Sequence, residues 1–245
     1  MLIGYGNEIS AKGETIGMRQ TLAWAVAVGL LFVGFACSTG LGQDTAADRW
    51  EPEIRKFEEQ DKKSPPSAGA NLFVGSSSIG LWKLPASFPN HVCINRGFGG
   101  SQLADSARYA ERIVIPSKPS VVVLYAGDND IASGKTPLAV RDDYRILRDK
   151  IQAALPETKI VVISLKPSPS RWKFREQAQE ANRLLREEVA AGKNQTFVDV
   201  WKPMLGEDGM PRADLFVKDN LHMNETGYKV WNGLVEPHLA LPPAG

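Results

Sequence analysis

The chain has 245 residues, of which 43% are hydrophobic and 23% are charged, and its formal net charge is +1. These values are typical of a globular protein with enough apolar residues for one sizeable core. The near-neutral balance excludes the strongly basic footprint of a nucleic-acid-binding protein, so we expect no nucleic-acid partner. The sequence also has no internal repeat and no Gly-x-x-x-x-Gly-Lys phosphate loop.

The first 42 residues have the pattern of an export signal. Arg19 precedes an apolar run from Leu22 to Cys37, and small residues follow this run. The run is too short to span a bilayer comfortably, which favours a cleaved signal over the alternative of an uncleaved anchor. Met18 is the natural start of such a signal, so residues 1–17 are interpreted as a misassigned upstream start. We expect an exported protein, periplasmic or extracellular, without a membrane span once the signal is removed.

The sequence contains two cysteines, Cys37 and Cys93. Cys37 ends the apolar run and suggests lipoprotein anchoring, although Gly34 stands where a lipobox usually has an aliphatic residue. Removal of the signal leaves Cys93 alone, which excludes an intramolecular disulfide and a cysteine metal site. Because Cys93 lies in an apolar run, we expect a buried and unreactive thiol.

Residues 45–240 predict a single α/β domain. The charged segment 44–63 carries Trp50, Ile54 and Phe57 at helical spacing. Short apolar runs, typical of strands buried on both faces, cover residues 71–74, 92–94, 121–125, 160–165 and 196–200. Amphipathic segments predict further helices over residues 104–113, 138–155, 171–191 and 225–239. This alternation predicts a parallel sheet of about five strands with helices on both faces.

In an open parallel sheet, ligands bind beyond the carboxyl ends of the strands, so the residues after each strand are the candidates for chemistry. After the first strand, Gly75-Ser76-Ser77-Ser78 can form a sharp turn that presents a serine. The alternative is that these serines only cap a helix. After the second strand, the glycines of segment 97–100 let backbone N–H groups converge on an anion, or form a turn with Ser101 as a cap.

The third strand is followed by Asn129, whose amide can donate a hydrogen bond to a developing oxyanion, or form an Asx turn. The neighbouring acids Asp128 and Asp130 raise a metal alternative, but Mg²⁺ or Ca²⁺ would need more carboxylates. Near the C-terminus, Asp219 precedes His222 by three residues. The carboxylate can fix the tautomer of the ring and leave its other nitrogen free as a base, whereas the alternative is a capping loop.

Together, these four blocks resemble the SGNH hydrolases, the GDSL-like esterases and lipases. The blocks are Ser77 in Gly75-Ser76-Ser77, Gly100 in Gly97-Phe98-Gly99-Gly100, Asn129 in Gly127-Asp128-Asn129-Asp130, and His222 with Asp219. The match covers essentially the whole of residues 45–240 and is particularly similar to the branch with the platelet-activating-factor acetylhydrolase catalytic subunits. The resemblance implies a three-layer, flavodoxin-like fold.

Two positions depart from the family pattern. Ser76 stands where the first block usually has aspartate, and Ser101 replaces the acid that often follows the glycine of the second block. The first departure leaves Ser76, Ser77 and Ser78 as candidate nucleophiles, and alignment on Gly75 selects Ser77.

The resemblance implies a serine esterase that needs no metal or organic cofactor. In this mechanism Ser77 attacks the ester, His222 moves the proton, and Asp219 orients the imidazole. The backbone N–H groups of Ser77 and Gly100 and the Asn129 side chain form the oxyanion hole.

The sequence has no long lid, so we expect short acyl esters as substrates, above all acetyl groups on carbohydrate. Trp172 is a candidate for stacking on a sugar, or packs with Phe174 on the following helix. Arg96 and Arg171 are candidates for contact with an anionic group. The alternatives are a thioesterase or lysophospholipase on the same site, a non-catalytic secreted binding module, and a flavodoxin-like nucleotide binder. The sequence predicts no particular oligomeric state.

Overall fold

The structure, a computed structural model, describes residues 48–241. The predictions of an export signal over residues 1–42, of a start at Met18 and of lipid anchoring at Cys37 lie outside the described residues. No helix within 48–241 combines the length and the apolar character that a membrane crossing requires.

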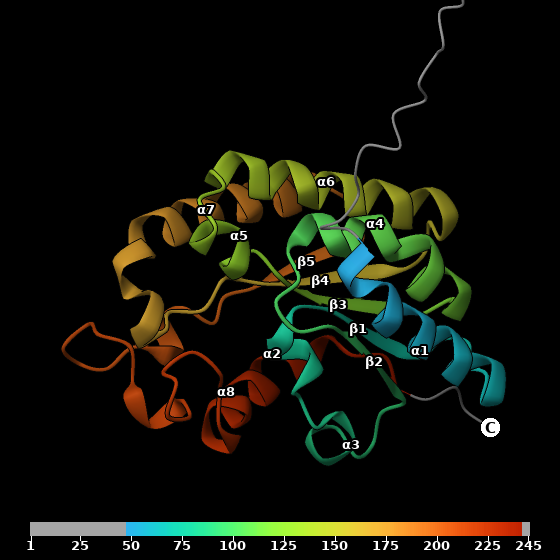
Figure 1. Cartoon of the computed structure of the whole chain (residues 1–245), viewed down its shortest axis with the longest axis horizontal. Helices are drawn as coiled ribbons and strands as arrows, with labels where there is room; N and C mark the ends of the chain where they lie inside the picture. Colours follow the sequence, from blue (N-terminus) through green and yellow to red (C-terminus); the bar gives the residue numbers. More distant parts are fainter. Residues whose placement is uncertain (1–47, 242–245) are drawn as a thin grey trace, which may run out of the picture. The chain divides into compact units, whose positions relative to one another are not determined.

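The sequence predicts a parallel sheet of about five strands, and the described residues form such a sheet of five strands (Figure 1). The strand order in the structure is β2-β1-β3-β4-β5. The strands are β1 (Asn71–Gly75), β2 (Cys93–Gly97), β3 (Val121–Tyr125), β4 (Lys159–Ile163) and β5 (Gln195–Val198). Gly75 pairs with Gly97 on one side and with Tyr125 on the other, so these three strands end level with one another. Their carboxyl ends therefore bring the predicted serine, glycine and asparagine blocks to one edge of the sheet.

Helices cover both faces of the sheet (Figure 1). One face packs against α1 (Glu51–Lys63), α4 (Leu103–Ile113), α6 (Pro137–Ala154) and α7 (Arg175–Ala191). The other packs against α2 (Ser77–Gly80), α3 (Leu84–Ser87) and α8 (Glu225–Val235). Because successive side chains of a strand point to opposite faces, Leu72 and Val74 enter the first core and Phe73 the second. The apolar runs of the central strands β1, β3 and β4 are thus buried on both sides, whereas the edge strands β2 and β5 are partly exposed.

Several element boundaries differ from the sequence prediction, among them those of β2 and α7. β2 continues to Gly97 rather than ending at residue 94, and its polar residues are tolerated because β2 is an edge strand. The Asn95 side chain donates a hydrogen bond of 2.7 Å to the carbonyl oxygen of Ile79. The segment predicted as one helix over 171–191 begins instead as a 3₁₀ helix, Pro169–Phe174, before α7.

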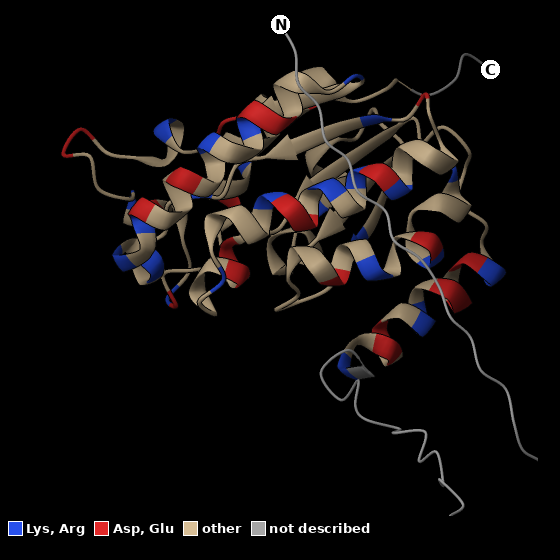
Figure 2. Cartoon of the chain, turned by 90° about the horizontal axis from the view of Figure 1, so that it is seen from above, with Lys and Arg blue, Asp and Glu red and all other residues tan. Residues whose placement is uncertain are grey.

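Charged side chains of both signs are interspersed along the helices (Figure 2). Several of them join neighbouring helices. Arg112 of α4 donates hydrogen bonds of 2.7–3.0 Å to Glu51 and Glu58 of α1. These ion pairs hold α1 against α4. The residues just before α1 contact the glycine block.

Candidate active site

The turn after β1 places Ser77 at the start of α2. Gly75 has a φ of 137°, and the backbone N–H of Ser76 donates to the Tyr125 carbonyl oxygen at 3.0 Å. The N–H of Phe98 donates to the Gly75 carbonyl oxygen at 2.9 Å, which ties the glycine block to the same turn. A strand-to-helix turn of this kind presents its serine at the sheet edge.

The three neighbouring serines have different surroundings. The Ser77 hydroxyl lies 2.9 Å from Nε2 of His222. The Ser76 hydroxyl is buried without a hydrogen-bond partner among the described residues. The Ser78 hydroxyl accepts a hydrogen bond of 3.1 Å from the Lys166 ammonium. Among these three, the structure brings Ser77 to the histidine.

A loop before α8 holds His222 and Asp219 together. Nδ1 of His222 lies 2.6 Å from Oδ2 of Asp219, and the other carboxylate oxygen accepts the backbone N–H groups of Leu221 and His222 at 2.9 Å. A backbone bridge between Phe216 and Met223 closes the loop at its base. The resulting chain of contacts runs from the Asp219 carboxylate through the imidazole to the Ser77 hydroxyl.

The hydrogen bonds to Asp219 change its acidity. Partial burial acts to raise the pKa of this carboxyl, but the hydrogen bonds from the His222 ring and from the backbone N–H groups outweigh burial and hold the pKa at about 2. Asp219 is therefore ionised at neutral pH and can orient the imidazole.

The glycine block, which holds one of the predicted oxyanion donors, passes close to Ser77. A Cβ atom built on Gly99 would lie 3.9 Å from Cβ of Ser77, so the backbone of the glycine block passes close to this serine. Gly100 follows with a φ of 75° and packs against the Trp50 ring. Asn129, at the start of α5 (Asp128–Ala132), donates a hydrogen bond of 2.8 Å to the carbonyl oxygen of Ser101. The structure thus connects the Asn129 amide to the glycine block.

Asp128, Lys166 and Arg171 form a charged cluster next to Asn129, here called the buried cluster. It was not predicted from the sequence. The Lys166 ammonium, with a side chain only 1% exposed, lies 3.0 Å from Asp128 and donates to the Tyr125 hydroxyl at 3.1 Å. Arg171 lies 3.2 Å from the same Asp128 oxygen. Burial favours a raised pKa for Asp128, but the two cations outweigh it and lower this pKa. The sequence feature that could have indicated this cluster is Lys166, which directly follows the apolar run of β4, together with Asp128, which follows β3.

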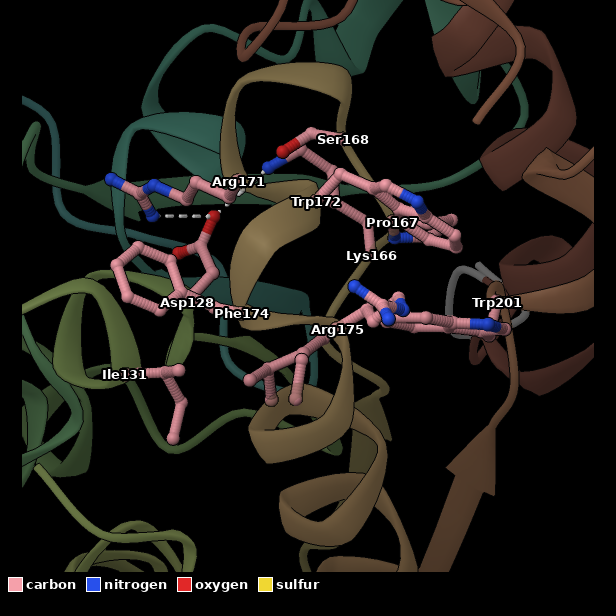
Figure 3. Close-up of a pocket in the computed structure, with 12 residues that line it drawn as sticks. Asp128, Ile131, Lys166, Pro167, Ser168, Arg171, Trp172, Phe174, Arg175 and Trp201 are labelled. Carbon is pink, nitrogen blue, oxygen red and sulfur yellow. Dashed lines mark hydrogen bonds and ion pairs between the residues drawn. The ribbon is translucent and has the colours of Figure 1, made fainter. Parts of the chain in front are cut away.

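Two hollows flank these residues. An open groove of about 650 Å³ beside His222 and Asp219 has apolar walls that include Leu81, Val217 and Tyr228. A cavity of about 20 Å³, large enough for a single water molecule, lies at the charged cluster, between Asp128 and Trp201 (Figure 3). The groove is lined in part by His222 and Asp219, whereas the small cavity is lined in part by Asp128 and Arg171 of the charged cluster.

The structure corrects the prediction for Arg96. Its side chain is 3% exposed, forms an ion pair with Asp61 of α1 and lies over the Phe57 ring. It points into the α1 side of the sheet, because alternate residues of β2 face opposite ways. Arg96 is therefore a structural residue and is not available to a substrate.

The predicted sugar contact, Trp172, lies in the 3₁₀ helix beyond β4. Its ring stacks on Trp201, with centroids 6.0 Å apart and an interplanar angle of 25°. Arg175 lies 5.8 Å from the same ring (Figure 3). The ring is half-buried, and its contact with a sugar remains a prediction.

The part of the chain that the structure describes has no cluster of three or more histidine, cysteine or acidic side chains placed to hold a metal ion. Cys93 is a free, half-buried cysteine, and burial raises the pKa of its thiol to about 11. This thiol is protonated at neutral pH, which makes it a poor nucleophile.

The comparison with protein families decides the class of this chain. Residues 78–230, more than half of the chain, match the model of the GDSL-like lipase/acylhydrolase family. The chain belongs to this family. It is therefore a carboxylic ester hydrolase, as the sequence predicts. The search of curated proteins gave no match.

Solved structures share the fold of this hydrolase. One is a protein from Streptococcus pneumonia described as a platelet activating factor, with a TM-score of 0.71, 20% identity and coverage of 78% of this chain and 92% of that chain. A protein from Bacteroides fragilis described as an acylhydrolase has a TM-score of 0.69, 21% identity and coverage of 80% of this chain and 97% of that chain. An acetylxylan esterase from Geobacillus stearothermophilus has a TM-score of 0.57, 15% identity and coverage of 72% and 96%. The α/β architecture is common to all three.

Proposed function

We propose that this hydrolase is a serine esterase that uses Ser77, His222 and Asp219. The observation that carries the proposal is the continuous hydrogen-bonded chain from Asp219 Oδ2 through the imidazole to Ser77 Oγ, with distances of 2.6 and 2.9 Å. A base held in one tautomer beside a hydroxyl is the arrangement that activates a serine for acyl transfer.

In the first half of the reaction, Ser77 Oγ attacks the carbonyl carbon and its proton moves to Nε2 of His222. The C–O bond to the leaving alcohol then breaks, and His222 returns the proton to that alcohol. Water repeats the sequence on the acyl-enzyme and releases the acid. The Asn129 amide and the N–H groups of Ser77 and Gly100 hold the negative oxygen, and loss of one such donor typically costs about 2.7–4 kcal/mol of barrier.

We propose short acyl esters, acetyl groups on carbohydrate above all, as the substrates. The short connections that follow strands β1, β2 and β3 and the acetylxylan esterase among the structures of like fold support this choice. The groove beside His222 favours a second candidate, an ester with a longer apolar chain, because Leu81 and Val217 expose apolar side chains there. Export of the enzyme, suggested by residues 19–42, fits an extracellular carbohydrate substrate.

Hydrolysis of p-nitrophenyl esters of increasing acyl length, by the wild type and by Ser77→Ala, tests the proposal. We expect kcat/KM to be highest for acetyl, to fall with chain length and to be lost in the variant. A maximum at longer chains would replace the acetyl assignment by the apolar candidate. Equal turnover by Ser77→Ala would contradict the serine mechanism.

A further inference from the structure

The predicted oxyanion donor Asn129 is held at both ends of its amide. Nδ2 donates to the carbonyl oxygen of Ser101 at 2.8 Å, and Oδ1 accepts a hydrogen bond of 2.7 Å from the Arg171 guanidinium. We propose that Arg171 is a positioning residue that orients and polarises Asn129 for catalysis; this rests on the proposed esterase function. Arg171 was a sequence candidate for contact with an anion, and the structure gives it this different partner.

The two partners of Asn129 permit only one orientation of the amide. Rotation of the amide by 180° would place Oδ1 against the Ser101 carbonyl oxygen and Nδ2 against the Arg171 guanidinium. Each contact would then join two acceptors or two donors, so the hydrogen bonds that hold the amide would be lost. The second hydrogen of Nδ2 is left for the substrate oxyanion, since an amide has two donors.

Arg171 also acts through its charge. A hydrogen bond from a cation to Oδ1 draws electron density through the amide and makes the Nδ2 hydrogens better donors, as cooperative hydrogen bonding in a low-dielectric site does. The negative charge on the substrate oxygen develops in the transition state. We therefore expect the polarisation of Asn129 by Arg171 to raise kcat rather than to lower KM.

The buried cluster holds Arg171 in place. Asp128 lies 3.2 Å from Nη1 of Arg171, and the buried Lys166 lies 3.0 Å from Asp128. The backbone N–H of Ser170 donates to the carbonyl oxygen of Asn220, which lies in the loop between Asp219 and His222, at 3.1 Å. The segment that carries Arg171 is thus fixed both to the cluster and to the histidine loop, which suits a residue that must position another.

A double-mutant cycle tests this inference. Arg171→Met, Asn129→Ala and the double variant are compared with the wild type on p-nitrophenyl acetate, and kcat and KM are measured separately. We expect Asn129→Ala to lower kcat by about 10²–10³-fold. Arg171→Met should lower kcat by about 10-fold with KM changed less than about 2-fold, because it removes the charge-assisted hydrogen bond from Arg171 to Asn129 Oδ1. In the Asn129→Ala background, the same Arg171 substitution should change kcat by less than about 2-fold.

Three further variants make the outcome specific. Arg171→Lys keeps the charge and can still donate one hydrogen bond toward Asn129 Oδ1, so it should retain more kcat than Arg171→Met. Arg183 lies on the exposed side of α7, and among the described residues its ion pairs are with Glu180 and Glu187, so Arg183→Met should leave kcat unchanged. Ser77→Ala reports on the esterase function itself.

An equal loss from Arg171→Met in both backgrounds, or a rise in KM at constant kcat, would overturn the positioning role alone. Wild-type turnover by Ser77→Ala would overturn the proposed function and the inference with it. If Arg171→Met does not fold, the cycle is run with Arg171→Lys, and the same non-additivity with Asn129→Ala decides the result.

Discussion

Gly75 and Tyr125 approach each other so closely that no side chain fits between them. A Cβ atom on Gly75 would lie 1.9 Å from the Tyr125 carbonyl oxygen, and the φ of Gly75 is 137°. The same carbonyl oxygen accepts the N–H of Ser76, one residue before Ser77. The glycine therefore lets the chain turn sharply at the end of β1 and bring Ser77 toward His222.

Gly75→Ala should displace this turn and lower both stability and turnover. Backbone atoms must move to relieve the clash, and overpacking and strain of this kind typically cost about 1–3 kcal/mol. Urea denaturation and p-nitrophenyl acetate turnover measure the two effects. Gly233→Ala is the control, because Gly233 is exposed in α8 with nothing near its Cβ position, and alanine there should raise stability by about 0.5–1 kcal/mol. Unchanged turnover in Gly75→Ala would show that the turn does not set the position of Ser77.

Asp219 should make the stability of the folded protein depend on acid pH. Its folded pKa of about 2 lies below the ordinary value of 3.8, so its stabilising contribution is present above the ordinary pKa and is lost as the pH falls through about 2. We expect the difference in unfolding free energy between the wild type and Asp219→Asn to be constant above about pH 5 and to shrink toward pH 2. The effect should be small because the carboxylate is 47% exposed and screened by water and salt. A difference in unfolding free energy that grows toward acid pH would contradict a lowered pKa for Asp219.

The buried pair Lys166–Asp128 should contribute strongly to folding. Lys166→Met leaves the Asp128 carboxylate with Arg171 as its remaining cation, and breaking a buried pair typically costs about 3–5 kcal/mol. Chemical denaturation measures the change. Lys56→Met is the matched control, because this exposed lysine pairs with Glu53 on the surface of α1, where such pairs contribute about 0–1 kcal/mol. Equal losses of unfolding free energy in the two variants would show that the buried pair contributes no more to stability than the exposed pair.

The Cys93 thiol should react slowly with alkylating agents in the folded protein. Burial raises its pKa to about 11, so the reactive thiolate is scarce at neutral pH. The labelling rate with iodoacetamide should rise with pH toward this value and should increase sharply on denaturation. Rapid labelling of the folded protein at neutral pH would contradict the burial of this thiol.

The sheet and the four blocks could be predicted from the sequence because each depends on residues that are neighbours in the chain. The runs of the central strands β1, β3 and β4 are apolar on both faces, and the serine, glycine, asparagine and histidine segments follow strands or precede a helix. By contrast, the placement of Arg96 depends on where β2 ends and on which face each of its residues occupies. An extension of three residues put Arg96 inside the strand, with its side chain toward Asp61 of α1.

The buried cluster was missed for a related reason. Asp128, Lys166 and Arg171 come from the ends of two strands and from a 3₁₀ helix, and they meet only in the folded chain. In the sequence, each of these residues has the pattern of an ordinary loop charge. Only the order of the strands, which places β4 beside β3, brings Lys166 to Asp128.

The central claim is that Ser77 is the nucleophile, and mass spectrometry after reaction with a fluorophosphonate tests it most directly. This reagent phosphonylates an activated serine with loss of fluoride, and peptide mapping identifies the modified residue. We expect one adduct per chain, located on Ser77 and absent in Ser77→Ala, with Ser76 and Ser78 unmodified. An adduct on Ser76 or Ser78, or full esterase turnover by a protein that carries the adduct on Ser77, would contradict it.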